Sequence, residues 1–168
     1  MRLLTLAVLA FVPMILEAGR AARNDRRLRA AGAIEPRLDV YVVMQVAYPA
    51  CFLAMIGEAW IRSSSAGAAV MAGLAVFTAA KALKYWAIAT LGPRWTFRVL
   101  VPPGSTRITS GPYAYLRHPN YLAVVGELLG MALMAGAPLT GAAAVVGFSA
   151  LILARIRVEE RELGLRGP

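Results

Sequence analysis

The sequence predicts an all-α integral membrane protein with about five transmembrane helices, of which the last two form a helical hairpin. Three observations support this fold class. Of the 168 residues, 59% are hydrophobic, and the mean hydropathy is +0.61. The apolar residues form continuous runs of the length that crosses a bilayer, rather than amphipathic stripes. The arginines gather between these runs. We therefore expect one membrane domain over residues 1–168.

The five predicted spans follow the apolar runs at residues 3–16, 38–61, 66–91, 119–135 and 139–154. The first run follows Arg2 as in a signal peptide, but the residues from Glu17 onward make a poor cleavage site, so we interpret it as an uncleaved helix. The connection at residues 136–138 is short enough to predict a tight hairpin. Gly126 and Gly130 have the GxxxG spacing of closely packed helices.

The positive charges predict the topology. Fourteen of the eighteen Lys and Arg follow the first, third and fifth runs, which lie on one side if there are five spans. They are Arg20, Arg23, Arg26, Arg27, Arg29, Arg37, Arg94, Arg98, Arg107, Arg117, Arg155, Arg157, Arg161 and Arg166. The positive-inside rule then places the N-terminus outside and the C-terminus in the cytoplasm, in a bacterial inner (plasma) membrane. No soluble basic face remains to bind nucleic acid, despite the net charge of +9.

Four ionisable residues lie within or beside the apolar runs. Lys81 and Lys84 are expected to extend their long stems to the cytoplasmic interface. Glu58 lies beside Trp60 at the other interface and is expected to be solvated. Glu127 lies two turns into the fourth run, where a carboxylate is costly unless it is paired, protonated or open to a cavity. We therefore interpret Glu127 as a residue of the functional site.

The segment at residues 92–120 carries most of the candidate chemistry. This polar connection is much longer than the others, and it holds the single histidine, His118. Pro119 is well placed as the first residue of the fourth helix, whose N-terminus, flanked by Arg117 and His118, suits an anionic group. The hairpin brings this end toward Glu159 and Glu160. Chemistry alone leaves two interpretations open, an interfacial salt-bridge cluster or a binding site.

These residues resemble a known family. The segment GPYAYLRHPNY at residues 111–121, followed by an apolar hairpin and RVEE at 157–160, is similar to the isoprenylcysteine carboxyl methyltransferase family. The segment LGPRWT at residues 91–96 and the preceding Tyr85-Trp86 resemble its bacterial members. The resemblance covers about residues 84–163, which would form the cofactor-binding part. It implies S-adenosylmethionine as methyl donor. The acceptor would be a lipophilic small molecule or lipid that reaches the site from the bilayer, and membrane lipids would be the other partners.

The resemblance also implies site residues. Those that would bind the cofactor are Tyr115, Leu116, Arg117, His118, Pro119, Tyr121, Glu159 and Glu160. Adjacent glutamates point about 100° apart on a helix, so we expect only one of the pair to make the main contact. Arg117 would stabilise the negative charge that the acceptor carries or develops. Glu127 is the predicted base for a phenolic acceptor. A carboxylate acceptor would need no base.

The acceptor is expected to be small. The chain stops eight residues after Glu160, whereas the isoprenylcysteine enzymes continue with an aromatic-rich segment. This difference favours a lipophilic carboxyl or hydroxyl acceptor over a prenylated protein. Similar bacterial sequences resemble methyltransferases of alkylated phenols, such as resorcinols or quinones. The sequence predicts no metal site and leaves the oligomeric state unknown.

Two other functions remain as alternatives. One is an NADPH-dependent membrane reductase on a related helical core, which cofactor binding would distinguish. The other is a small transporter or assembly subunit without enzymatic activity. That alternative predicts inverted repeats and charges facing a pore in mid-membrane. The sequence favours neither feature, because its polar residues gather at one face.

Overall fold

The computed structural model describes the backbone at residues 1–35, 40–62, 67–100, 102–104 and 108–162. Its five long helices are α1 (Arg2–Ala30), α2 (Tyr41–Arg62), α3 (Gly67–Leu91), α4 (Pro119–Ala135) and α5 (Pro138–Glu162), with two short 3₁₀ helices, η1 (Gly92–Arg94) and η2 (Gly111–Ala114). The described residues form no strand, and the helices are apolar. The all-α membrane fold with a C-terminal hairpin is therefore confirmed.

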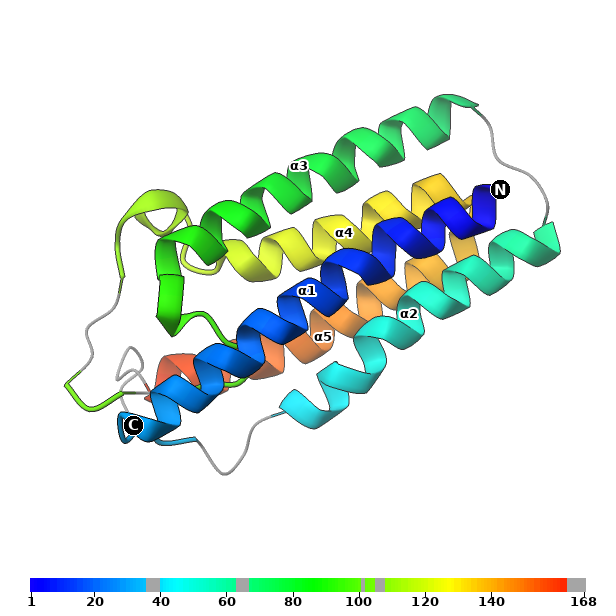
Figure 1. Ribbon diagram of the computed structural model, residues 1–168. Helices are drawn as coiled ribbons and strands as arrows, with labels where there is room; N and C mark the ends of the chain where they lie inside the picture. Colours follow the sequence, from blue (N-terminus) through cyan, green and yellow to red (C-terminus); the bar gives the residue numbers. More distant parts are fainter. Residues whose placement is uncertain (36–39, 63–66, 101, 105–107, 163–168) are drawn as a thin grey trace.

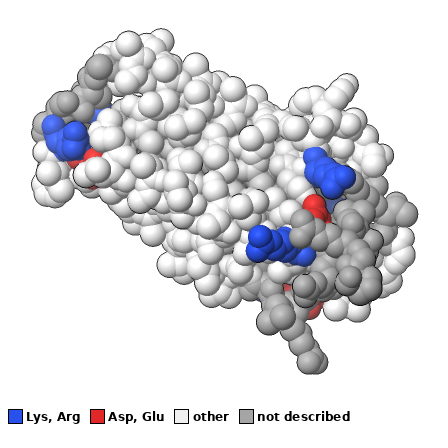
Figure 2. All heavy atoms as spheres, turned by 180° about the vertical axis from the view of Figure 1, so that it is seen from behind, with Lys and Arg blue, Asp and Glu red and all other residues white. Residues whose placement is uncertain are grey.

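The helices run alternately in opposite directions, so successive connections lie at opposite ends of an elongated bundle (Figure 1). One end carries the α1–α2 connection, the α3–α4 connection and the end of α5. We call it the Arg-rich end, because the predicted arginine clusters lie in the last part of α1, after α3 and in the last part of α5. Arg37, Arg107 and Arg166 of those clusters lie outside the described residues. In the face shown in Figure 2, charged side chains occupy the two ends and the flank between them is uncharged.

Four of the helices are long and apolar enough to cross a membrane, and α4 is a shorter apolar helix of 17 residues. At 1.5 Å per residue, α4 extends roughly 26 Å, which is close to the hydrocarbon thickness. Gly136 ends α4 in the left-handed conformation, with φ at +61°. Pro138 then begins α5, so the predicted tight hairpin has only two linking residues.

Two helices extend further than their apolar runs. The 29 residues of α1 span roughly 44 Å, because the Ala- and Arg-rich sequence after Leu16 continues the helix to Ala30. The basic residues of its last turn also complement the helix dipole. Similarly, α5 continues to Glu162 rather than ending near Ala154. Glu159 and Glu160 therefore lie on the helix and not after it.

Small residues bring α3 and α4 into close contact. A Cβ atom added at Gly130 would lie 2.6 Å from the backbone nitrogen of Phe77, and one added at Gly126 would lie 2.9 Å from the Cβ of Ala80. On the opposing helix, a Cβ at Gly73 would lie 2.7 Å from the carbonyl oxygen of Gly130. The predicted packing role of the two glycines on α4 is therefore confirmed.

Charged side chains cap the hairpin at the end opposite the Arg-rich end. The Arg2 guanidinium donates to the carbonyl of Ala135 at 2.7 Å, where α4 ends. The Glu58 carboxylate accepts from the backbone nitrogen and the hydroxyl of Thr140, at 2.7 and 2.6 Å, where α5 begins. Glu58 is only 9% exposed, so the expectation that it is solvated was wrong. The unpaired N–H groups of a helix N-terminus explain why this carboxylate is buried there.

We predict that Gly130→Ala destabilises the protein by about 1–3 kcal/mol, because the new methyl group meets backbone atoms of α3 that cannot rotate away. Gly147→Ala on α5 is the matched control, since nothing lies within 4 Å of its added Cβ. The control should change stability little or raise it slightly, given the better helix propensity of alanine. Reversible unfolding in mixed micelles measures both variants. Equal stability of the two would contradict the packing role.

Candidate active site

The site lies where α4 begins, at the Arg-rich end. Pro112 within η2 is almost fully buried and anchors the segment that leads into α4. His118 is the N-cap residue and Pro119 is the first helical residue, as the sequence predicts. Pro119 is also almost fully buried, which fixes the helix start against its neighbours. The segment therefore presents His118 at a defined position beside α5.

The hairpin brings His118 to the glutamate pair of α5. The His118 Nε2 atom lies 3.3 Å from Oε1 of Glu160, and its Nδ1 lies 3.9 Å from Oε2 of Glu159. The Tyr121 hydroxyl, one turn into α4, donates to Glu159 at 2.9 Å. Arg155 of α5 donates through Nε to the same hydroxyl at 2.9 Å. These residues form two hydrogen-bonded links between α4 and α5, one from His118 to Glu160 and one from Arg155 through Tyr121 to Glu159.

A polar cavity of about 160 Å³ opens beside these links. Its walls carry both signs of charge as well as aromatic rings. The lining residues used below are Arg94, Tyr113, His118, Tyr121, Arg155 and Glu159. Glu160 does not line this cavity, although its carboxylate contacts Nε2 of His118. Of the two glutamates, Glu159 is thus the one that faces the cavity.

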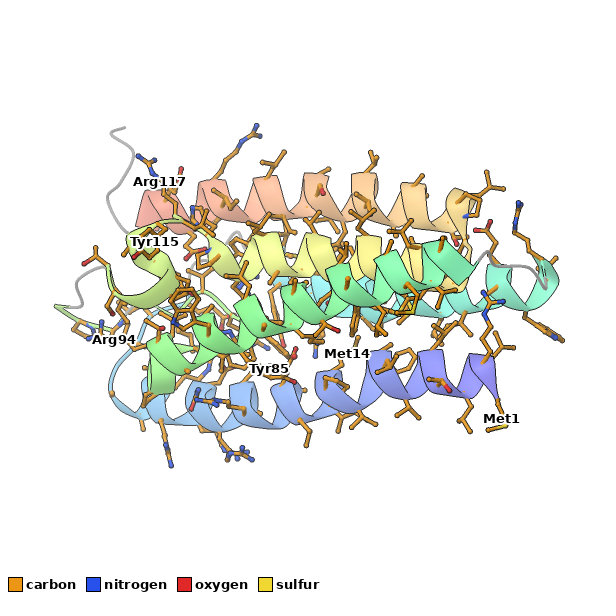
Figure 3. The ribbon with its side chains drawn as sticks, turned by 90° about the horizontal axis from the view of Figure 1, so that it is seen from above. Met1, Met14, Tyr85, Arg94, Tyr115 and Arg117 are labelled. Carbon is orange, nitrogen blue, oxygen red and sulfur yellow. The ribbon has the colours of Figure 1, made fainter. Side chains whose placement is uncertain are left out.

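A second, mainly apolar chamber of about 360 Å³ lies next to the polar cavity, inside the bundle. Residues of α1 and α2 form much of its wall, including Met14, Met44 and Pro49. Met14 lies about midway along the bundle (Figure 3). Thr96, Asn120, Tyr121 and Arg155 line both cavities and mark their junction. The site is therefore two-part, polar at the Arg-rich end and apolar inside.

The segment after η1 closes one side of this junction. Trp95 is 2% exposed, and its indole nitrogen donates to Asn120 at 3.4 Å. Asn24 of α1 donates to the carbonyl of Trp95 at 2.8 Å. Arg155 donates to the carbonyl of Phe97. Three helices thus hold this segment over the site.

Ion pairs hold the same segment after η1 in place. The Arg98 guanidinium lies 2.5 Å from Glu35 and 3.5 Å from Asp25, and it stacks on the ring of Tyr41 at 4.2 Å. Burial tends to raise the pKa of Glu35, but hydrogen bonds from Arg29 and Arg98 outweigh it, so that this pKa is lowered. Glu35 therefore stays ionised and keeps Arg98 in place.

Near the polar cavity, the pKa of the Tyr113 hydroxyl is raised, first by burial and then by the negative charge of Glu159. Tyr113 therefore stays protonated at neutral pH and remains a hydrogen-bond donor. Its proton is available to an acceptor group placed in this cavity.

The structure does not bring all the predicted cofactor-binding residues to this site. Tyr115 is 83% exposed, and Leu116 and Arg117 are exposed as well. Neither of the two cavities is lined by these three residues. Tyr115 and Arg117 lie at the end of the bundle opposite Met1 (Figure 3). The roles predicted for them stay predictions.

Glu127 belongs to a buried group of four charges, which we call the four-charge cluster: Glu17, Lys81, Lys84 and Glu127. Lys84 lies 2.7 Å from Glu17 and 3.2 Å from Glu127, and Lys81 lies 3.0 and 3.1 Å from the same two carboxylates. Tyr48 of α2 donates its hydroxyl proton to Glu127. Lys84 is only 3% exposed, so the expectation that both lysines extend to the interface was wrong. The carboxylates bind them inside the bundle.

Sequence reasoning missed several of these residues. Arg155 lies four residues before Glu159, a spacing that places both on one helix face, so this signal was available. Glu17 appeared to end the first span, but α1 continues past it without a break. Tyr48 and Asn24 carry no local signal, because their partners lie on distant segments.

The comparisons with known proteins identify the family of the chain. The model of the isoprenylcysteine carboxyl methyltransferase (ICMT) family matches residues 71–165, more than half of the chain. The uncharacterized protein YpbQ of Bacillus subtilis (strain 168) is 29% identical over 158 residues, which cover 94% of each chain. An uncharacterized protein of Haemophilus influenzae is 30% identical over 139 residues, which cover 82% of this chain and 81% of the relative. No solved structure matches the chain.

We predict that Lys84→Met destabilises the protein by about 3–5 kcal/mol, because Glu17 and Glu127 would share a single ammonium and leave one buried charge uncompensated. The double variant Lys84→Met with Glu17→Gln restores neutrality and should recover at least half of the loss. Unfolding in mixed micelles compares them with Arg157→Met, an exposed position on α5. A loss no larger than that of the exposed variant would refute the charge balance.

Proposed function

We propose that this chain, which belongs to the isoprenylcysteine carboxyl methyltransferase family of membrane methyltransferases, is an S-adenosylmethionine-dependent O-methyltransferase. Its acceptor would be a lipophilic molecule with a carboxyl or phenolic hydroxyl group. One observation carries the proposal: the polar cavity at His118 and Glu159 adjoins an apolar chamber, and Tyr121 and Arg155 line both. A polar methyl donor and a lipophilic acceptor need such adjoining compartments.

The residues of the polar cavity suit the methyl donor. S-adenosylmethionine supplies a methyl group already activated by the sulfonium, and it offers a carboxylate, an ammonium and a ribose diol for recognition. The carboxylate suits the cationic and hydrogen-bonding side, where Arg94 and His118 lie. The ammonium or the ribose suits Glu159, which faces the cavity. The cavity volume of about 160 Å³ suits the amino-acid part of the donor, with the remainder reaching beyond it.

The apolar chamber suits the acceptor. Its volume of about 360 Å³ is in the usual range for small-molecule sites, and its wall is mostly apolar. Arg155 stands at the junction with its side chain fixed by Tyr121 and by the carbonyl of Phe97. A fixed guanidinium there would orient a carboxylate, or stabilise the negative charge that a phenol develops as it loses its proton.

A phenolic acceptor must give up a proton, and the geometry favours a different route from the one that the sequence predicts. Glu127 lies six residues after Tyr121, roughly 9 Å deeper along α4, and it does not line the chamber. Tyr121 lies at the junction and donates to Glu159. We therefore assign the proton route to these two residues: the acceptor hydroxyl would give its proton to the Tyr121 oxygen as the Tyr121 proton passes to Glu159, while the bound methyl donor would supply the methyl group and leave as the neutral thioether.

We further propose that the Arg-rich end faces the cytoplasm of a bacterial cell, in the inner (plasma) membrane, with the N-terminus outside. The arginine distribution supports this orientation, because positive residues are retained on the cytoplasmic side. The polar cavity would then open to the cytoplasm, where the methyl donor is made. The apolar chamber would take its acceptor from the inner leaflet.

We predict that Glu159→Gln and His118→Ala each weaken S-adenosylmethionine binding about tenfold or more, because each removes a partner of a charged group in the donor. Arg157→Gln, an exposed position two residues before Glu159, is the control and should bind like wild type. Titration calorimetry on the purified protein gives the affinities. NADPH serves as the competing cofactor. Wild-type binding of NADPH alone would support the reductase instead.

We predict that protein incubated with labelled S-adenosylmethionine and a bacterial lipid extract transfers label to a lipophilic product, identified by mass analysis. Tyr121→Phe should lower kcat by about 10²-fold or more on a phenolic acceptor, because the proton route is lost. On a carboxylate acceptor the same variant should retain most of its kcat. An equal loss on both acceptors would exclude the proton route, and the absence of any labelled product would count against the methyltransferase.

A further inference from the structure

The second half of α1, which reaches the Arg-rich end (Figure 1), carries three arginines that the proposed methyl transfer does not use. Arg20, Arg23 and Arg27 are exposed and follow one another at three- and four-residue spacing, so they lie on one face of the helix. They line neither the polar cavity nor the apolar chamber. We call these three residues the α1 arginine row. Like charges at this spacing repel one another, and a nearby anion would relieve the repulsion.

The protein itself supplies no anion to the α1 arginine row. In the part of the chain that the structure describes, none of the three arginines forms an ion pair. The two acidic residues of α1 have other partners, because Glu17 lies 2.7 Å from Lys84 and Asp25 lies 3.5 Å from Arg98. An anion that neutralises the row must therefore come from another molecule.

The face of α1 that carries this row is apolar further toward its N-terminus. Val8, Val12 and Leu16 precede Arg20 at four-residue intervals and are 49%, 49% and 66% exposed. Apolar side chains so exposed on a membrane-spanning helix contact acyl chains. A phospholipid that lies along this face would meet apolar side chains with its acyl chains and arginines with its phosphate. A small inorganic anion would use only the second of these two parts.

The depth of the row matches the headgroup layer of a bilayer. A Cβ atom added at Gly19 would lie 3.8 Å from Nη1 of Arg23, so the Arg23 side chain extends back over this glycine, toward the apolar residues. Gly19 comes three residues after Leu16, which is roughly 4.5 Å along the helix. The headgroup layer on each side of a bilayer is roughly 5–7 Å thick, so the Arg23 guanidinium lies within it. Since glycine has no side chain, the helix surface beside this guanidinium stays open.

We propose that the α1 arginine row binds the phosphate of an anionic phospholipid, over Gly19, while the acyl chains of this lipid lie along Val8, Val12 and Leu16. Charge selects the anionic class, because a zwitterionic phospholipid carries an ammonium group that the arginines repel. The bound lipid is not the methyl acceptor, since a phosphodiester offers neither a carboxyl nor a phenolic hydroxyl group. The proposal is therefore independent of the proposed function.

The test titrates the purified full chain, in micelles of a zwitterionic detergent, with phosphatidylglycerol or with phosphatidylcholine of the same acyl chains. Native mass spectrometry counts the bound lipid molecules at each concentration. Wild type should bind one phosphatidylglycerol about tenfold or more tightly than phosphatidylcholine, because each basic residue near an anionic headgroup contributes about fivefold. Arg20→Gln combined with Arg23→Gln should reduce this ratio to about twofold or less.

Two further variants separate a defined site from general attraction between charges. Arg117→Gln combined with Arg157→Gln is the matched control, because it removes the same charge from exposed positions of the same end and should keep the wild-type ratio. Gly19→Leu keeps every charge but places a side chain where the phosphate lies. It should weaken phosphatidylglycerol binding about three- to tenfold, the usual effect of one lost hydrogen bond. Circular dichroism of every variant checks that the helices are intact.

Three outcomes would overturn the proposal. Equal wild-type affinity for the two lipids would show that the row does not select an anionic headgroup. An equal loss in the control pair and in the Arg20 and Arg23 pair would show attraction by total charge and no site on α1. Inorganic phosphate is the third probe and should bind far more weakly than the lipid. If phosphate binds as tightly as phosphatidylglycerol, the row is a site for a free anion and the acyl chains play no part.

Discussion

The structure depends on charge neutrality at one buried point. Glu17 and Glu127 face Lys81 and Lys84 where α1, α3 and α4 meet, and Tyr48 adds α2 to the same contact. Each ion alone would cost several kcal/mol in an apolar surround, so the four are stable only together. Because the four charges must meet, α1, α3 and α4 can slide little along one another. The chamber wall and the junction at Tyr121 take their positions from this contact.

Much of the fold was predictable from local signals. The apolar runs, the GxxxG spacing and the proline that begins α4 each act within a few residues, and the structure confirms them. The approach of His118 to the glutamates also followed from topology, because a two-residue hairpin leaves the start of α4 beside the end of α5. Turn chemistry and helix length thus determine the polar half of the site.

The rest of the site depends on long-range pairing that the sequence does not encode locally. Lys81 and Glu17 are 64 residues apart, and nothing near either one indicates the other. A lysine stem can reach an interface or a carboxylate, and only the arrangement of helices decides between them. For the same reason the exposure of Tyr115 was not predictable, because its motif determines the identity of the residue and not the direction of its side chain.

The contact between Arg2 and the end of α4 has a consequence for biogenesis. Arg2 precedes its partner Ala135 by 133 positions in the chain. During synthesis α1 therefore enters the membrane long before the helix that it caps. The contact of Arg2 with the end of α4 therefore forms only after the chain has been made as far as the hairpin, whereas the pairing of Glu17 with Lys81 and Lys84 needs only α1 and α3.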